Sequence, residues 1–288
     1  MALALKYMYN PAYFERLCPV LKECIPGFDC TDFIIRIFNN EWPDKELKDR
    51  VRHITHVLHH FLLKDFSLAS RQITGISTAL RHQAGGNGFQ NIFLADYLEV
   101  YGLNLPDQAL GAMEEVTKLV SAEFAVRPFI ARYTNLTMTY LYKWSRSDHP
   151  AVRRVASEGC RPRLPWAMAL SDFKRDPTPI LPVLENLKED VSEDVRKSVA
   201  NNLNDIGKDH PELIISLVQK WKGKNLQTDW ILKHGCRSLL KKGHVQALFL
   251  HGFDPDSRAR IAELLLPTKV RIGNYLDFKF AFISKEKR

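Results

Sequence analysis

Hydrophobic residues recur along most of the chain at the spacing of three and four residues that indicates amphipathic helices. Asn10 and Pro11 precede the first such segment and are suited to cap it and to occupy its first turn. A glycine-rich stretch at 84–88 predicts a loop. The expected helices span 12–17, 29–38, 44–62 and 91–102, with further helices in 106–144.

One segment of the chain resembles a later one. Residues 149–158 can be laid over 192–201, which places Val195 43 residues after Val152, and a looser third copy at 230–237 follows 36 residues further on. A period of about 40 residues with two helices in each repeat is typical of HEAT-type solenoids, whose concave side forms an extended binding surface. A non-repeating helical bundle is the alternative. The matching apolar positions are Val152, Ala156 and Cys160 in the first copy, and Val195, Val199 and Leu203 in the second.

The pattern changes near the end of the chain. From Leu276 to Phe282 apolar and polar residues alternate, which predicts a strand. We therefore expect an all-α, HEAT-like helical-repeat domain over 1–268 and a short β-like C-terminal extension over 269–288.

Composition narrows the class of protein. No apolar run approaches the roughly 18 residues of a membrane span, and the apolar start is too short for a signal peptide. The five cysteines are odd in number and form no CxxC pair, so we expect free thiols in a reducing compartment rather than a zinc site or a disulfide framework. Several histidines fall within 53–60, where the polar side of a helix is favoured over a metal site because no acidic or Cys ligand joins them.

Positive charge is concentrated in the second half. Residues 1–150 contain 16 Lys and Arg and 16 Asp and Glu, whereas residues 151–288 contain 25 and 17, so the whole excess of +8 follows residue 150. This distribution favours a surface that binds the phosphates of a polyanion, with DNA expected, although an acidic protein partner would suit the same surface.

Residues 157–166 combine a helix end with a stiff basic loop. Gly159 and two prolines break the helix and fix the backbone. Arginines in such a loop are suited to pair with phosphates, and Trp166 to lie against a sugar or base, although a single Trp is more often part of a core. The predicted DNA contacts are Arg153, Arg154, Arg161, Arg163, Trp166, Arg196, Lys197, Lys233 and Arg237.

Residues 156–166, with the sequence ASEGCRPRLPW, resemble the signature of the bacterial DNA alkylation repair glycosylases, the AlkC/AlkD superfamily. Residues 8–17, MYNPAYFERL, and the following Pro26-Gly27-Phe28-Asp29 are similar to the AlkC branch in particular. Some AlkC-type proteins carry a C-terminal immunoglobulin-like domain, and 269–288 resembles its first strands.

The resemblance implies a bacterial cytoplasmic enzyme, associated with the nucleoid when bound to DNA. It implies removal of N-alkylated bases from duplex DNA, chiefly 3-methyladenine and, in the AlkC branch, 3-methylcytosine, with no metal, organic cofactor or obligate protein partner. Alkylation makes the base cationic and a good leaving group, and its departure builds oxocarbenium character on the sugar. A nearby carboxylate would stabilise that charge and orient or deprotonate a water. Most enzymes that act on bases flip them, whereas this family is expected to act on a lesion that stays largely stacked.

Three carboxylates are candidates for this role. Glu158 is the first, because it lies in the signature at the end of a repeat helix. Glu123 precedes a rigid Arg-Pro element, and Asp205 ends the next repeat helix in a comparable place. Asp229 is a weaker candidate. Each could instead be structural, Glu158 by capping its helix or pairing with Arg161.

Two other function classes remain open beside a monofunctional glycosylase. One is a non-catalytic HEAT-like DNA-binding protein, and the other is a scaffold that holds an acidic protein on its concave face. Glu158 favours the glycosylase, because a surface that only binds phosphate gains nothing from a carboxylate within its basic loop.

Overall fold

The computed structural model describes residues 4–83, 88–253 and 260–283, and these residues are mainly helical. The chain divides into two compact units, Met1–Ser238 and Leu239–Arg288. The helices of the first unit are α1 (Pro11–Cys24), α2 (Cys30–Ile37), α3 (Leu47–Phe61), α4 (Phe66–His82), α5 (Phe93–Gly102), α6 (Pro106–Val116), α7 (Arg127–Arg132), α8 (Thr134–Trp144), α9 (Pro150–Gly159), α10 (Ser171–Arg175), α11 (Leu181–Leu187), α12 (Glu193–Ile206), α13 (Pro211–Trp221) and α14 (Leu226–Gly235).

Side-chain caps explain where several helices begin. The Asn10 side chain accepts a hydrogen bond from the backbone N–H of Tyr13 at 3.0 Å, and Pro11 occupies the first turn of α1. Asp29 caps α2, and Asp65 caps α4. Each cap satisfies backbone donors that have no partner within the first turn of a helix.

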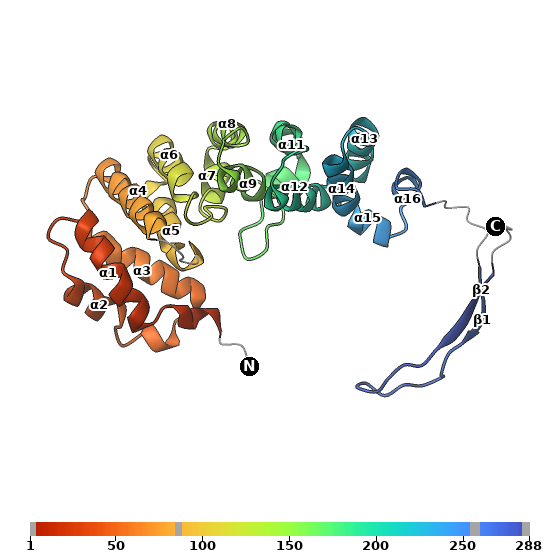
Figure 1. Cartoon of the computed structure of the whole chain (residues 1–288), viewed down its shortest axis with the longest axis horizontal. Helices are drawn as coiled ribbons and strands as arrows, with labels where there is room; N and C mark the ends of the chain where they lie inside the picture. The colour runs from red at the N-terminus through yellow and green to blue at the C-terminus, as the bar shows by residue number, and fades with distance from the viewer. Residues whose placement is uncertain (1–3, 84–87, 254–259, 284–288) are drawn as a thin grey trace. The chain divides into compact units, whose positions relative to one another are not determined.

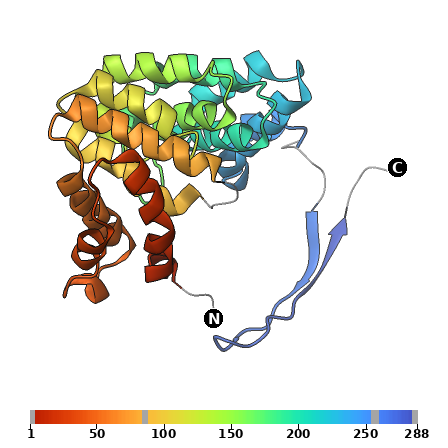
Figure 2. The same ribbon diagram turned by 60° about the vertical axis from the view of Figure 1, so that its left-hand side comes forward.

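The helices of the first unit stack side by side in two rows (Figure 1). One row contains α9, α12 and α14, in which α12 packs against both neighbours. The other contains α4, α6, α8 and α11, and Figure 2 shows the same stacking from a second direction. The apolar stripes Val152–Ala156–Cys160 and Val195–Val199–Leu203 are buried. The predicted repeat and the all-α fold are therefore confirmed.

Two predictions about the helical unit need revision. Helix α4 was not among the expected helices, although Asp65 supplies a strong cap at its start. Cys18 and Cys30 form a disulfide, which leaves Cys24, Cys160 and Cys236 as free thiols. The expectation of free thiols throughout is therefore wrong for one pair, because α1 and α2 pack against one another and join cysteines that are 12 residues apart in sequence.

The second unit contains helix α16 (Val245–Leu250) and two strands, β1 (Arg260–Leu265) and β2 (Lys279–Ile283), while α15 (Arg237–Lys241) spans the boundary between the units. The strands pair antiparallel, with an irregularity between Ala262 and Leu265. The alternation after Leu276 thus does form a strand. Strand β1, however, lies inside the range 1–268 that was expected to be helical. The likeness of 269–288 to an immunoglobulin-like domain stays a prediction.

Candidate active site

Two of the predicted carboxylates lie at the ends of neighbouring repeat helices. Glu158 is the second-to-last residue of α9, and Asp205 is the second-to-last residue of α12. Because these helices pack side by side, their C-terminal ends are adjacent. Both residues are buried, with 5% of Glu158 and 2% of Asp205 exposed.

The Arg161 guanidinium joins these two carboxylates. Its Nη1 lies 2.6 Å from Oε1 of Glu158, and its Nη2 lies 2.9 Å from Oδ2 of Asp205. Ser198 of α12 donates a hydrogen bond of 2.5 Å to Oε2 of Glu158, and Lys208 pairs with Oδ1 of Asp205 at 3.0 Å. Burial acts to lower the pKa of Arg161, but the two carboxylates outweigh it and hold that pKa above its ordinary value. The result is a fixed network in which every carboxylate oxygen has a partner.

Glu123 lies against the same end of α9, in the segment that links α6 to α7. Its carboxylate accepts hydrogen bonds from Ser121 Oγ at 2.8 Å and from Arg154 Nη1 at 2.6 Å. Arg154 belongs to α9, one turn before Glu158. A Cβ atom placed on Gly159 would lie 3.9 Å from the Glu123 carbonyl oxygen and only 2.5 Å from Cγ1 of Val126. The absence of a side chain at Gly159 therefore permits the segment at 123–126 to lie close to the C-terminal end of α9. Glu123, Glu158 and Asp205 thus lie around this helix end and are called the carboxylate cluster below.

A buried arginine that the sequence analysis did not select holds the loop between Gly159 and Met168. The Arg127 guanidinium, which is completely buried, donates from Nη1 to the carbonyl oxygens of Gly159 and Arg161, both at 2.9 Å. It also donates from Nε and Nη2 to the Met168 carbonyl, at 2.8 and 2.6 Å. Burial lowers its pKa to about 10. Arg127 thus ties the start of the loop to its end; the only sequence signal for this role was the Arg-Pro pair after Glu123.

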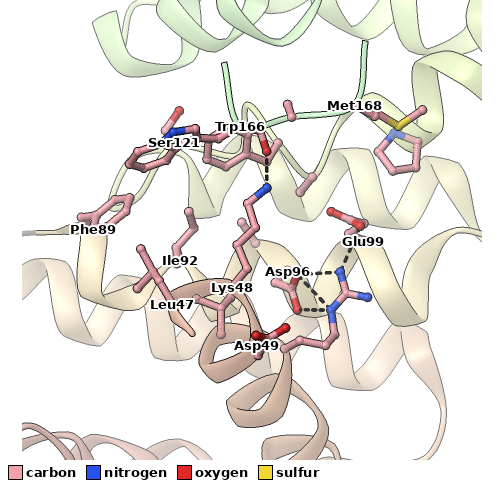
Figure 3. A pocket seen from close by; sticks show the side chains of 17 residues that line it. Leu47, Lys48, Asp49, Phe89, Ile92, Asp96, Glu99, Ser121, Trp166 and Met168 are labelled. Carbon is pink, nitrogen blue, oxygen red and sulfur yellow. Dashed lines mark hydrogen bonds and ion pairs between the residues drawn. The ribbon is translucent and has the colours of Figure 1, made fainter. Parts of the chain in front are cut away.

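Trp166 projects from this loop. Its side chain is 64% exposed, and its backbone lies in the left-handed region at φ 66°. Its carbonyl oxygen accepts a hydrogen bond from Lys48 of α3. Figure 3 shows the Trp166 ring beside Ser121 and Phe89, on one wall of a cavity. The loop therefore presents an aromatic face to solvent beside Ser121, whose hydroxyl binds the Glu123 carboxylate.

Most of the residues predicted to contact phosphate instead pair with other groups of the protein. Arg161 is enclosed between two carboxylates, so its guanidinium is not available to a phosphate in this structure. Lys233 is exposed on α14. The remaining cations and their partners are Arg153 with Asp190, Arg154 with Glu123, Arg163 with Asp209, Arg196 with the carbonyls of Asp190 and Val191, Lys197 with Glu193, and Arg237 with Asn201.

Neither a metal site nor a membrane span emerges from the described part of the chain. Within 4–83, 88–253 and 260–283, no group of three His, Cys, Asp or Glu side chains is placed to hold a metal ion. Three histidines of α3, His53, His56 and His59, instead contact carbonyls or tyrosine hydroxyls, as His56 does with the Tyr101 hydroxyl at 2.8 Å. Over the same residues, no helix has the length and apolar character needed to cross a membrane.

Comparison with known proteins assigns the chain to a family. The sequence model of the DNA alkylation repair enzymes matches residues 120–239. The chain is 39% identical over 277 residues to the uncharacterized protein YhaZ of Bacillus subtilis, an alignment that covers 96% of this chain and 76% of that protein. The chain belongs to the DNA alkylation repair enzyme family.

A solved structure shares the fold of this chain. It is the Pseudomonas fluorescens alkylpurine DNA glycosylase AlkC, bound to DNA containing an abasic site analog. The identity is 33% and the TM-score 0.83, over 99% of this chain and 78% of that one. The expected likeness to the AlkC branch is thereby confirmed. The family match at 120–239 contains all three carboxylates and both buried arginines of the site.

Proposed function

We propose that this protein is a DNA glycosylase that excises cationic N-alkylated bases, chiefly 3-methyladenine and also 3-methylcytosine, from duplex DNA. The observation that carries the proposal is the grouping of Glu123, Glu158 and Asp205 around the C-terminal end of α9. This group falls within the family match, and AlkC, which the chain resembles over 99% of its length, is named an alkylpurine DNA glycosylase.

The charges of the group suit this reaction. Glu158 and Asp205 share the Arg161 guanidinium, and Lys208 adds a second cation at Asp205, whereas Oε2 of Glu158 accepts a hydrogen bond from the neutral Ser198 hydroxyl. Of the two carboxylates, Glu158 is therefore the less neutralised. A fixed negative charge stabilises the oxocarbenium character of the sugar as the base departs, and it needs no rearrangement during the reaction. The alkylated base is already cationic, so it leaves without a protein acid.

The three carboxylates differ in access, and this difference suggests their roles. The Glu123 side chain is 14% exposed, whereas those of Glu158 and Asp205 are 7% and 2% exposed. We assign to Glu158 the stabilisation of charge on the sugar, and to Glu123 the orientation of the attacking water. Asp205 is a positioning residue that holds Arg161 against Glu158.

Release of free bases from methylated duplex DNA, followed by chromatography, tests the proposal. Glu158→Gln should retain duplex binding but lose on the order of 10²-fold or more in the rate of release, because the amide carries no charge. Glu115→Gln is the matched control and should release bases at the wild-type rate, since Glu115 has its own ion pair with Lys118 and its side chain is 44% exposed. If the wild-type protein releases no 3-methyladenine, the proposal is wrong.

A non-catalytic DNA-binding protein is the second candidate. It is favoured by one observation, namely that both oxygens of Glu158 are held by groups of the protein, as they would be in a purely structural network. In that case wild-type protein and Glu158→Gln would bind duplex DNA equally, and neither would release bases.

A further inference from the structure

A cavity of about 400 Å³ lies between α3, α5 and the loop that carries Trp166. Its volume is within the range of roughly 300–1,000 Å³ found for small-molecule sites. Phe89, Phe124 and Trp166 give it three aromatic walls, and Arg52, Asp96 and Glu99 form a polar side. Figure 3 shows this combination of an aromatic wall above and carboxylates below. Such a site suits a flat aromatic molecule with hydrogen-bonding groups along one edge.

The cavity adjoins the carboxylate cluster of Glu123, Glu158 and Asp205, but none of these three residues lines it. Ser121 lines the cavity and donates a hydrogen bond to the Glu123 carboxylate. Met168, on the same wall, is held through its carbonyl oxygen by Arg127, which also holds the backbone next to Glu158. A group released at the carboxylates would therefore find the cavity beside it.

The polar side offers a donor next to an acceptor. Arg52 binds Asp96 through Nε and Nη2, and its Nη2 also contacts Oε1 of Glu99 at 3.2 Å. Across the described part of the chain, Nη1 of Arg52 and Oε2 of Glu99 have no hydrogen-bond partner. 3-Methyladenine carries an amino donor beside a ring-nitrogen acceptor, because alkylation at N3 leaves the ring nitrogens next to its amino group free. Burial and the neighbouring Asp96 raise the pKa of Glu99 to about 7, so this carboxyl is readily protonated near neutral pH.

The charges of the cavity disfavour a nucleotide. Lys48 and Arg52 balance Asp49 and Asp96, and Glu99 adds a negative charge whenever it is deprotonated, so the lining residues carry no excess of positive charge. A phosphate would find no compensating charge there, whereas a neutral base needs none.

We propose that the cavity binds the free nucleobase after it leaves the DNA, stacked on Trp166 and hydrogen-bonded by Glu99 and Arg52. The ligand class is an amino-substituted purine without sugar or phosphate. The inference rests on the proposed glycosylase function and adds a product site to it. It assigns to α3 and α5, which precede the family match at 120–239, a part in holding the released base.

Calorimetric titration of the full chain with free 3-methyladenine, in the absence of DNA, tests the inference. We expect saturable binding of one base per chain, and binding of adenosine 5′-monophosphate at least tenfold weaker. Trp166→Ala removes the stacking surface at an exposed position, and Glu99→Met removes the hydrogen-bonding group at nearly constant size. Each should weaken binding at least tenfold, whereas Glu115→Met, the matched control, should leave binding unchanged.

Two results would overturn the inference. One is the absence of saturable binding at a Kd below about 1 mM, and the other is binding that neither Trp166→Ala nor Glu99→Met weakens. A base-release assay on the same preparation separates this failure from that of the glycosylase itself. If the protein releases 3-methyladenine from DNA but does not bind the free base, the glycosylase function stands and the product site is refuted. Protein that releases no base refutes the function, and the titration still decides whether the cavity binds bases.

Discussion

Replacement of Arg161 by Met tests whether the buried charge network holds the site together. The side chains of Arg161, Glu158 and Asp205 are 8%, 7% and 2% exposed, so the substitution leaves two carboxylates in the interior without their shared cation. Breaking a buried ion pair on one side costs about 3–5 kcal/mol, because a charge remains without compensation. Ser198 and Lys208 keep their contacts with the carboxylates, so we expect a loss near the lower limit, about 3 kcal/mol.

The loss should depend on pH with a definite sign. Arg161 is charged throughout the range in which proteins fold, since its pKa is held above its ordinary value. In the variant, the orphaned carboxylates are stabilised when they take up a proton, because protonation removes a buried charge. The folded variant then binds more protons than its unfolded chain, so its stability falls as the pH rises. The difference from the wild type should therefore be larger at pH 8 than at pH 5.

Urea unfolding followed by far-UV circular dichroism measures this difference at each pH. Arg163→Met is the matched control, because Arg163 pairs with Asp209 at the surface, with side chains that are 35% and 28% exposed. Its loss should stay below about 1 kcal/mol. If Arg161→Met lowers the free energy of unfolding no more than this control does, or by the same amount at pH 5 and pH 8, the network does not contribute the stability expected of a buried ion pair.

Three further outcomes follow from the geometry. Arg127→Met should destabilise the protein by about 3 kcal/mol in urea unfolding, because three loop carbonyls lose their donor, and it should slow base release. The control is Arg132→Met, at an exposed position on the same helix, which should change the free energy of unfolding by less than about 0.5 kcal/mol. Gly159→Ala should lower the free energy of unfolding by about 1–3 kcal/mol in thermal denaturation, because its Cβ would meet Cγ1 of Val126 at 2.5 Å; an unchanged Tm would contradict the close approach. Glu99→Gln should gain stability relative to the wild type as the pH rises from 4.5 through about 7, because only the wild type must then bury a charge at this position. Equal pH profiles of the two proteins in urea unfolding would refute this prediction.

The repeat was predictable because it depends on local spacing. Val152 and Val195 mark apolar stripes with the helical period, and a stripe of this kind must face a neighbouring helix. From that repeat it followed that Glu158 and Asp205 end successive helices at comparable places, which the packing of α9 against α12 bears out. Helix α4 was missed, although the cap at Asp65 was visible in the sequence.

The partners of the arginines could not be predicted in the same way. Arg161 meets Glu158 three residues earlier, a separation that helix geometry suggests, but it meets Asp205 44 residues later through the packing of two repeats. Arg127 reaches Met168, 41 residues on, across a loop whose path no spacing rule specifies. The disulfide between Cys18 and Cys30 likewise depends on how two helices pack rather than on sequence spacing.

Pairing also changes what the basic half of the chain can do. The excess of +8 lies entirely after residue 150, yet Arg161 is enclosed by carboxylates and Arg153 binds Asp190 with a side chain only 15% exposed. An arginine paired in this way contributes little potential to a phosphate nearby, because the charge of its partner cancels its own at a distance beyond a few ångströms. Attraction for DNA must then come from exposed cations such as Lys233. The buried arginines act on the reaction through the position that they give to Glu158 and to the Trp166 loop, so loss of one should reduce base release much more than it reduces duplex binding.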